Sequence, residues 1–162
     1  MRAESAMVQA GVDLVGEFRQ GLKALKQGHP QKALVHMRTA FESEKHNPFY
    51  ISFLGLAVAR AERRWDRAAE LCEIAVQLRR NECQFHLNLA EVYALAGRRE
   101  KALDTIDVAL ARFGKDARLV RARSRVEKRR APVLPFLTRN HFLNRTFGKV
   151  RHRTLSRFGK TA

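Results

Sequence analysis

The stretch "AEVYALAGRREKALDTIDVAL", residues 90–110, places small side chains at regular intervals and contains no cluster of nucleophilic or metal-binding residues. Two of its alanines recur at matching positions of two earlier segments. The three pairs are Ala33 and Ala40, Ala68 and Ala75, and Ala102 and Ala109. Steps of 35 and 34 residues separate successive pairs. Self-similarity at this period predicts a stack of helical hairpins.

A second apolar segment precedes each of these three helices. Gly21, Gly55 and Ala90 occupy matching places in it, with steps of 34 and 35 residues, so the turn of the second copy has one extra residue near 62–64. Small side chains let antiparallel helices approach closely. No alternating strand pattern competes, and the sequence predicts an all-α fold. The expected helices are 12–27, 31–45, 48–62, 66–79, 82–96, 99–112 and 117–130.

Helix-end signals agree with these ranges. Pro30 and Pro48 suit the first position of a helix. Asn81 with Gln84 is typical of a capping box, and Asp116 is expected to cap the helix that follows Gly114.

The three copies resemble the tetratricopeptide repeat, a helix–turn–helix unit of about 34 residues. The matching residues are Gly21, Ala24, Gly28, Ala33, Met37 and Ala40; Leu54, Gly55, Val58, Trp65, Ala68, Cys72 and Ala75; and Leu89, Ala90, Tyr93, Gly97, Ala102, Ile106 and Ala109. The chain departs from the family where Glu17, Ile51 and His86 replace an aromatic residue, and where a closing proline is missing. The resemblance implies a right-handed α-solenoid of antiparallel helix pairs that acts as an interaction scaffold.

The chain is expected to divide into four parts. Residues 1–11 form an N-terminal extension, 12–114 three repeats, 115–130 a basic capping helix, and 131–162 a proline-containing linker with a basic amphipathic tail. No signal peptide or membrane-spanning stretch is recognisable, so we expect a cytoplasmic protein. Cys72 and Cys83 lack motif spacing and are expected to be reduced, half-buried thiols.

Positive charge is concentrated at the C-terminal end. Residues 1–114 hold 17 of the 32 Lys and Arg residues beside 14 of the 16 acids, whereas 115–162 hold 15 basic and 2 acidic residues. This asymmetry indicates an acidic partner, which could be a protein, a nucleic acid or an anionic membrane surface.

The first helices of such repeats line a groove, and the residues on the groove side are unusually apolar here. The candidate partner-binding residues are Phe18, Leu22, Leu25, Phe49, Leu56, Leu87 and Glu91. Phe18 and Leu22 stand where co-chaperone members of the family carry the basic and asparagine side chains that clamp a terminal carboxylate. The groove therefore favours an amphipathic helix with acidic flanks. The alternative is that these residues pack against the chain's own ends.

The capping helix extends the groove with basic side chains. The repeat step places Arg118, Arg121, Arg125, Lys128 and Arg129 on the groove side as a basic rim. Leu119, Val120, Ala122 and Val126 are expected to close the core. The alternative is that this charge only keeps a terminal helix soluble.

The tail combines apolar and basic residues at helical spacing. Its candidate binding residues are Arg145, Lys149, Arg151, Arg153 and Arg157. A basic amphipathic helix suits an anionic lipid surface or an acidic protein groove, and its aromatic residues would also suit RNA. A tail that folds back onto the solenoid is a further alternative.

No motif for catalysis, for a cofactor or for a metal is present in the sequence. His29, His36 and His46 have no acidic or cysteine partners at metal-ligand spacing, and no hydrolase elbow or zinc-protease helix occurs. We therefore expect a non-enzymatic scaffold or adaptor that binds a peptide or helix of a partner protein and takes no small-molecule substrate. A nucleic-acid or membrane-surface module acting through residues 115–162 is the alternative.

Overall fold

The computed structural model describes residues 14–127 of the 162-residue chain. The expected N-terminal extension, Lys128, Arg129 and the basic tail lie outside the described residues. The boundaries expected for these parts therefore stay predictions.

All regular structure between residues 14 and 127 is helical, as the sequence predicts. The helices are α2 (Leu14–Lys26), α3 (Pro30–Ser43), α4 (Pro48–Glu62), α5 (Trp65–Leu78), α6 (Cys83–Leu95), α7 (Arg99–Phe113) and α8 (Ala117–Glu127). Every expected helix is present, and the ends that lie within the described residues fall within two residues of the expected ones. Pro30 and Pro48 begin α3 and α4, which confirms their use at a first helical position.

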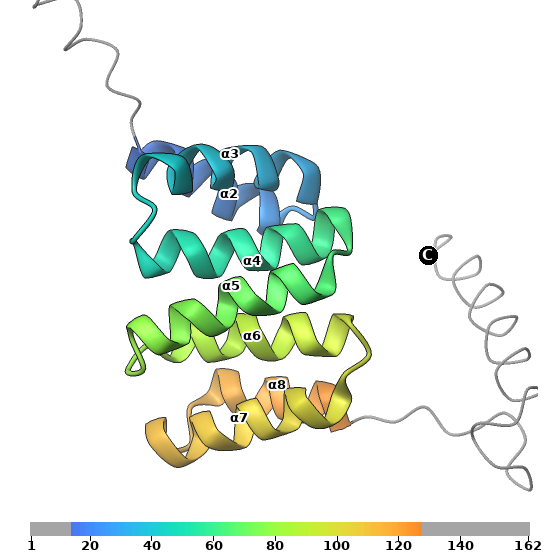
Figure 1. Ribbon diagram of the computed structural model, residues 1–162. Helices are drawn as coiled ribbons and strands as arrows, with labels where there is room; N and C mark the ends of the chain where they lie inside the picture. The colour runs from blue at the N-terminus through green and yellow to red at the C-terminus, as the bar shows by residue number, and fades with distance from the viewer. Residues whose placement is uncertain (1–13, 128–162) are drawn as a thin grey trace, which may run out of the picture. The chain divides into compact units, whose positions relative to one another are not determined.

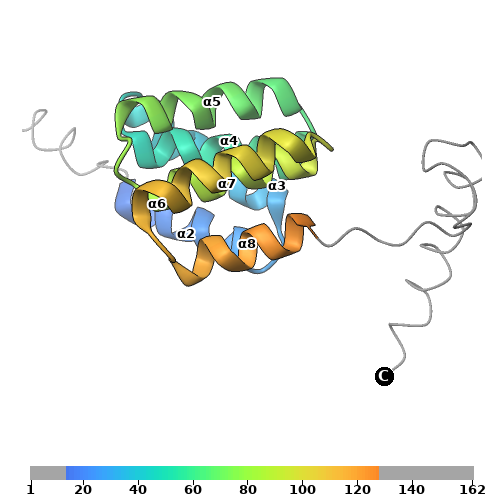
Figure 2. The same ribbon diagram turned by 90° about the horizontal axis from the view of Figure 1, so that it is seen from below.

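The helices pair into antiparallel hairpins α2–α3, α4–α5 and α6–α7, and α8 closes the stack (Figure 1). The first helices of the hairpins also contact one another, α2 with α4, α4 with α6, and α6 with α8. Each second helix packs on the first helix that follows it, and α3, α5 and α7 make no contact with each other within residues 14–127. The first helices therefore form the inner layer of the stack, and the second helices form the outer layer. Figure 2 shows the stack from the end that carries α8.

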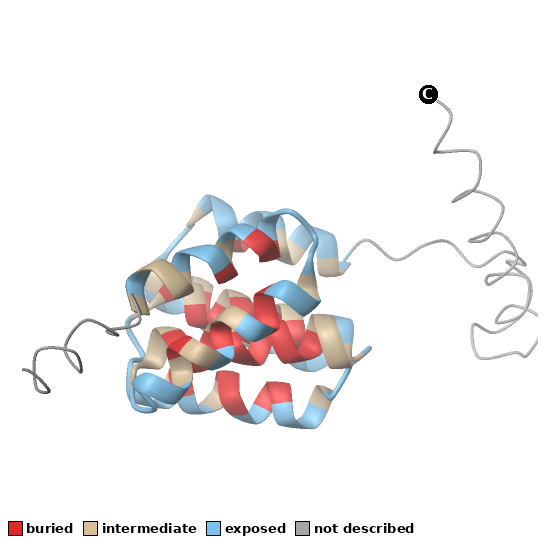
Figure 3. Ribbon diagram, turned by 90° about the horizontal axis from the view of Figure 1, so that it is seen from above, coloured by how far each residue is buried: buried red, intermediate tan, exposed pale blue. Residues whose placement is uncertain are grey.

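Small residues allow the two helices of a hairpin to approach closely. Ala33, Ala68 and Ala102 are fully buried, which confirms the alignment of the three copies. A Cβ atom on Gly21 would lie 2.7 Å from Cε of Met37. One on Gly55 would lie 2.8 Å from the backbone oxygen of Ala68, so this pair of helices is in contact through its backbones. The buried residues gather between the layers, along the length of α4 in particular (Figure 3).

The predicted capping residues are partly confirmed. Asp116 accepts a hydrogen bond of 2.7 Å from the backbone N–H of Arg118, as expected for the residue before α8. The capping box at Asn81 is wrong. α6 begins one residue later, and the carboxylate of Glu82 accepts the hydrogen bond from the N–H of Gln84. The side-chain oxygen of Asn81 instead accepts a hydrogen bond from Arg112 of α7.

The extra residue of the second copy lengthens a helix rather than a turn. α4 has 15 residues, whereas α2 and α6 have 13, and only two residues connect α4 to α5. The turns of the first and third hairpins use Gly28 and Gly97, with φ of 75° and 77°. Arg63 takes the left-handed position in the second hairpin, with φ of 58°. This conformation is unfavourable for a residue with a Cβ atom.

Candidate functional site

The inner face, which we define as the surface formed by α2, α4, α6 and α8, carries the predicted partner-binding residues. On α2, Phe18 and Leu22 are partly exposed, whereas Leu25 is buried. The ring of Phe18 lies 5.0 Å from that of Tyr50 and 5.4 Å from that of Phe53, between ring centroids. Phe18 therefore joins α2 to α4 and presents only part of its ring to the surface.

α4 lies in the middle of the stack and offers little of its apolar surface. Leu56 is only 4% exposed and belongs to the hydrophobic core, so it has almost no area to give to a partner. Phe49 is partly exposed at the start of the helix. Its ring packs edge-on against Phe85 at 4.9 Å, and the guanidinium of Arg79 lies 5.5 Å from its centroid.

α6 provides an apolar and an acidic side chain to the inner face. Leu87 is partly exposed and packs on the smaller core cluster near α8. The carboxylate of Glu91 accepts hydrogen bonds from Nε of Arg60, at 2.8 Å, and from Nη2. A third N–H of Arg60 donates to the backbone oxygen of Leu25 at 3.2 Å. Arg60 thus ties α4 to both neighbouring first helices, and Glu91 has a partner within the domain.

A polar cluster lies beside these apolar residues, between α4 and α6. The amide of Asn88 donates to the hydroxyl of Ser52, and that of Gln84 donates to the side-chain oxygen of Asn88, both at 2.9 Å. Ser52 and Asn88 are almost fully buried. Because buried polar groups need partners, this cluster fixes how α4 and α6 face each other.

α8 presents the described part of the predicted basic rim. Arg118 pairs with the neighbouring carboxylate of Asp116 at 2.9 Å, which lowers the pKa of Asp116 to about 2. Arg121 donates to the backbone oxygen of Ala117, one turn earlier. Arg121 and Arg125 are exposed, and neither has a carboxylate partner among residues 14–127. These two arginines are free to attract an anionic group.

The expectation that α8 closes the core is confirmed for Leu119, which is fully buried, and for Ala122 and Val126, which pack on the core. It is wrong for Val120, which is 44% exposed. No second helix of a fourth hairpin covers Val120 within the described residues.

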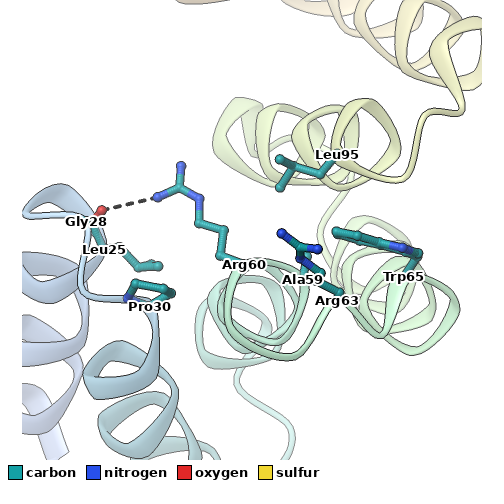
Figure 4. A pocket seen from close by; sticks show the side chains of 8 residues that line it. All are labelled: Leu25, Gly28, Pro30, Ala59, Arg60, Arg63, Trp65 and Leu95. Atoms are coloured by element: carbon teal, nitrogen blue, oxygen red, sulfur yellow. Dashed lines mark hydrogen bonds between the residues drawn. The ribbon is translucent and has the colours of Figure 1, made fainter. Parts of the chain in front are cut away.

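A pocket of about 550 Å³ opens at the carboxyl-terminal ends of α2, α4 and α6 (Figure 4). Apolar side chains from three hairpins and two arginines form its wall. The lining residues are Leu25, Gly28, Pro30, Ala59, Arg60, Arg63, Trp65 and Leu95. Figure 4 shows the Arg60 side chain reaching toward α2 and the Arg63 side chain lying near the indole of Trp65.

Neither Arg60 nor Arg63 is among the functional candidates that the sequence predicts. The missing glycine of the second turn was a usable signal for Arg63, because the first and third turns carry Gly28 and Gly97. Arg60 had no signal of this kind. Its two interactions join residues 31 and 35 positions away, and only the packing of three hairpins reveals them.

The described residues offer no constellation for metal or nucleophilic chemistry. Nδ1 of His36 lies 2.8 Å from a carboxylate oxygen of Glu17, but no group of three or more His, Cys, Asp or Glu residues within 14–127 could hold a metal ion. Cys72 and Cys83 are buried free thiols, not half-buried as expected. Burial raises the pKa of the Cys72 thiol strongly, so it remains protonated. Between residues 14 and 127 no helix has the length and apolar character needed to cross a membrane.

A family model described as the tetratricopeptide repeat matches residues 59–126, which include α5, α6, α7 and all but the last residue of α8. No curated protein sequence matches the chain. Among solved structures, a thermophilic tetratricopeptide-repeat protein of Thermus thermophilus superposes with a TM-score of 0.63 at 21% identity. The match covers 76% of this chain and 68% of that one.

Two further structures show the same arrangement of helices. The tetratricopeptide-repeat domain of Sgt2 from Aspergillus fumigatus has a TM-score of 0.61 at 16% identity, covering 72% of this chain and 78% of that one. The second such domain of human RPAP3, solved with the HSP70 peptide SGPTIEEVD, has a TM-score of 0.58 at 15% identity, covering 72% and 96%. Residues 59–126 therefore match the tetratricopeptide-repeat family model, and residues 14–127 share the fold of these structures, with three helical pairs and a capping helix.

Proposed function

We propose that the inner face binds a segment of a partner protein that combines an apolar helix face with acidic side chains. Tetratricopeptide-repeat domains are protein–protein interaction modules and generally act as scaffolds rather than as catalysts. We therefore assign this chain the role of an adaptor. The proposal goes further in stating the chemistry of the partner.

The observation that carries the proposal is the pairing of charge and apolar surface on the inner face. Leu22 and Leu87 are partly exposed on α2 and α6, and Arg121 and Arg125 on α8 have no carboxylate partner within the described residues. Apolar side chains supply binding free energy through burial, whereas exposed cations steer an acidic segment and fix its direction. An amphipathic helix with acidic residues beside its apolar face meets both requirements.

The human RPAP3 domain was solved with a peptide that ends in Glu-Glu-Val-Asp. That complex supports an acidic peptide as the class of partner for a fold of this kind. We do not propose chaperone tails for this chain, because Phe18 and Leu22 replace the polar clamp that co-chaperones use. Phe18 also packs on Tyr50 and Phe53, so α2 offers the segment an apolar contact at this place.

The test is a binding titration with the full chain and a fluorescein-labelled amphipathic peptide that carries glutamates beside a leucine stripe. Arg121→Glu with Arg125→Glu should weaken binding by about tenfold or more, since each reversal turns an attraction into a repulsion. Lys32→Glu with Arg80→Glu changes the net charge equally. Both of these residues are exposed, Lys32 on α3 of the outer layer and Arg80 just before α6, so this pair is the matched control. Equal affinities of the two double variants would overturn the proposal.

The same proteins distinguish the alternative partner classes. Binding of single-stranded RNA or of anionic vesicles that falls steeply with salt would indicate a nucleic-acid or membrane-surface module. If the full chain binds RNA or anionic vesicles and fails to bind any acidic peptide, the alternative function replaces the one proposed here.

A further inference from the structure

We propose that the pocket bounded by Leu25, Ala59, Arg63 and Leu95 is the anchor site of the partner segment. It would accept one large apolar side chain of the partner together with an adjacent Asp or Glu. This inference rests on the proposed function and specifies where on the inner face the segment is held. The pocket lies where α2, α4 and α6 end, so three hairpins contribute to it.

The walls of the pocket suit an apolar group. Leu25, Ala59, Trp65 and Leu95 all line it, and Leu95 is 44% exposed, so it has apolar area that a ligand could bury. The volume of about 550 Å³ lies within the range of sites that hold ligands, which is about 300–1,000 Å³. An aromatic or leucine side chain would cover Leu95 and gain binding free energy by burial.

The two arginines of the pocket differ in how many of their N–H groups already have partners. Arg60 is already bound to Glu91 and to the backbone oxygen of Leu25. Arg63 is exposed, lines the pocket, and has no carboxylate partner among the described residues. A carboxylate that enters beside the apolar group would find Arg63 available, and charge-assisted hydrogen bonds of this kind are among the stronger polar contacts.

The backbone at Arg63 supports a binding role. The equivalent turns place Gly28 and Gly97 in the left-handed region, where glycine is not strained. An arginine at this position, with φ of 58°, costs conformational free energy that glycine would avoid. This unfavourable conformation, at a residue whose side chain lines the pocket, supports a role of Arg63 in recognition.

The occupant we infer is a protein segment, because the pocket lies at the ends of α2, α4 and α6, the helices that also form the inner face. Leu25 and Ala59 lie one helical turn beyond Leu22 and Leu56 on the same sides of α2 and α4. A helix or extended peptide lying along the inner face can therefore place one residue in the pocket. An acidic neighbour to that residue complements Arg63.

The experiment uses the full chain and three peptides of the acidic amphipathic series. The parent peptide carries a tryptophan flanked by glutamate, the second replaces the tryptophan with serine, and the third replaces that glutamate with glutamine. The serine peptide should bind the native protein more weakly than the parent. Arg63→Glu should weaken the parent peptide by about tenfold. Arg64→Glu is the matched control, because Arg64 is also exposed and adjacent in the chain but does not line the pocket.

Two comparisons separate anchoring from general attraction. Replacing the peptide glutamate should cost affinity for the native protein and should raise affinity for Arg63→Glu, where the two carboxylates repel each other, as expected of two groups in direct contact. Arg63→Gly should bind the parent peptide more weakly while its urea midpoint rises, an outcome that a purely structural arginine would not produce.

The failure of this inference is distinct from the failure of the proposed function. If the parent peptide binds, responds to reversal of Arg121 and Arg125, and is unaffected by either change at Arg63, the pocket is not the anchor and the inner face remains the binding surface. If no acidic peptide binds the native chain, the proposed function itself fails.

Discussion

Adding one methyl group to Gly55 tests the close helix contact on which the stack depends. A Cβ atom at this position would lie 2.7 Å from Sγ of Cys72 and 2.8 Å from the backbone oxygen of Ala68. The Ala68 oxygen belongs to α5 and cannot move without the helix. Gly21 provides the comparison, because a Cβ atom there would meet only side-chain atoms of Met37, at 2.7 to 3.2 Å.

The expected magnitudes follow from these obstacles. Overpacking a core typically costs about 1–3 kcal/mol, and alanine in a helix interior recovers about 0.5–1 kcal/mol relative to glycine. Gly55→Ala should be at the destabilising end of the overpacking range, with a net loss of about 2 kcal/mol in the free energy of unfolding, because α4 and α5 must separate. Gly21→Ala should stay within about 1 kcal/mol of the native protein, since the flexible side chain of Met37 can rearrange.

Urea unfolding followed by far-UV circular dichroism measures both changes in the free energy of unfolding. A third variant, Gly55→Ala with Cys72→Ala, removes the obstacle at Sγ and leaves the one at the Ala68 oxygen. It should recover only part of the loss. The reasoning is refuted if Gly55→Ala is as stable as the native protein, or if Gly21→Ala is the more damaging of the two glycine changes.

Three other changes probe polar groups of the described domain. Asn88→Leu should lower the free energy of unfolding by about 2 kcal/mol, because the buried Ser52 hydroxyl loses its hydrogen-bond donor. Adding Ser52→Ala should restore much of this loss, and the urea midpoints of the two variants measure both effects. Burial and the hydrogen bond to Glu73 raise the pKa of Tyr93 to about 12 from 10.0. The contribution of Tyr93 to the free energy of unfolding is therefore complete below pH 10 and disappears as the pH rises toward 12. Tyr93→Phe should remove this pH dependence, which urea unfolding at alkaline pH measures. The pKa of Asp116 is lowered to about 2 from 3.8, so its stabilisation of the folded domain is present above pH 3.8 and disappears as the pH falls toward 2. Asp116→Asn should remove this loss of stability from an acid titration followed by helix content. An acid titration of the variant that still shows the loss would contradict the role of Asp116 as a cap.

The repeat pattern was sufficient to predict the helices and their pairing. Ala33, Ala68 and Ala102 recur at fixed spacing because each faces the first helix of its own hairpin, and this constraint is local to about 34 residues. The fold was therefore readable from one sequence. The capping residue of α6 was not, since Asn81 is the better cap by residue type, yet its side chain accepts a hydrogen bond from Arg112 of α7 and Glu82 caps the helix instead.

The candidate site was less predictable because exposure depends on neighbouring hairpins. Leu22 and Leu56 hold equivalent positions in their repeats, yet Leu22 is partly exposed on the terminal α2 and Leu56 is buried in the central α4. Helical spacing alone treats them alike. The pocket beside Arg63 escaped prediction for a similar reason, since its walls come from three hairpins that are far apart in the sequence.

The separation of α3, α5 and α7 has a mechanical consequence. Within residues 14–127 these outer helices do not touch one another, so a tilt between successive hairpins has to repack only the contacts of each hairpin with the first helix of the next. Each joint of the stack should therefore adjust independently of the others. Small tilts at each joint would add up along the stack, and the curvature of the inner layer could then adjust to the width of whatever lies against it.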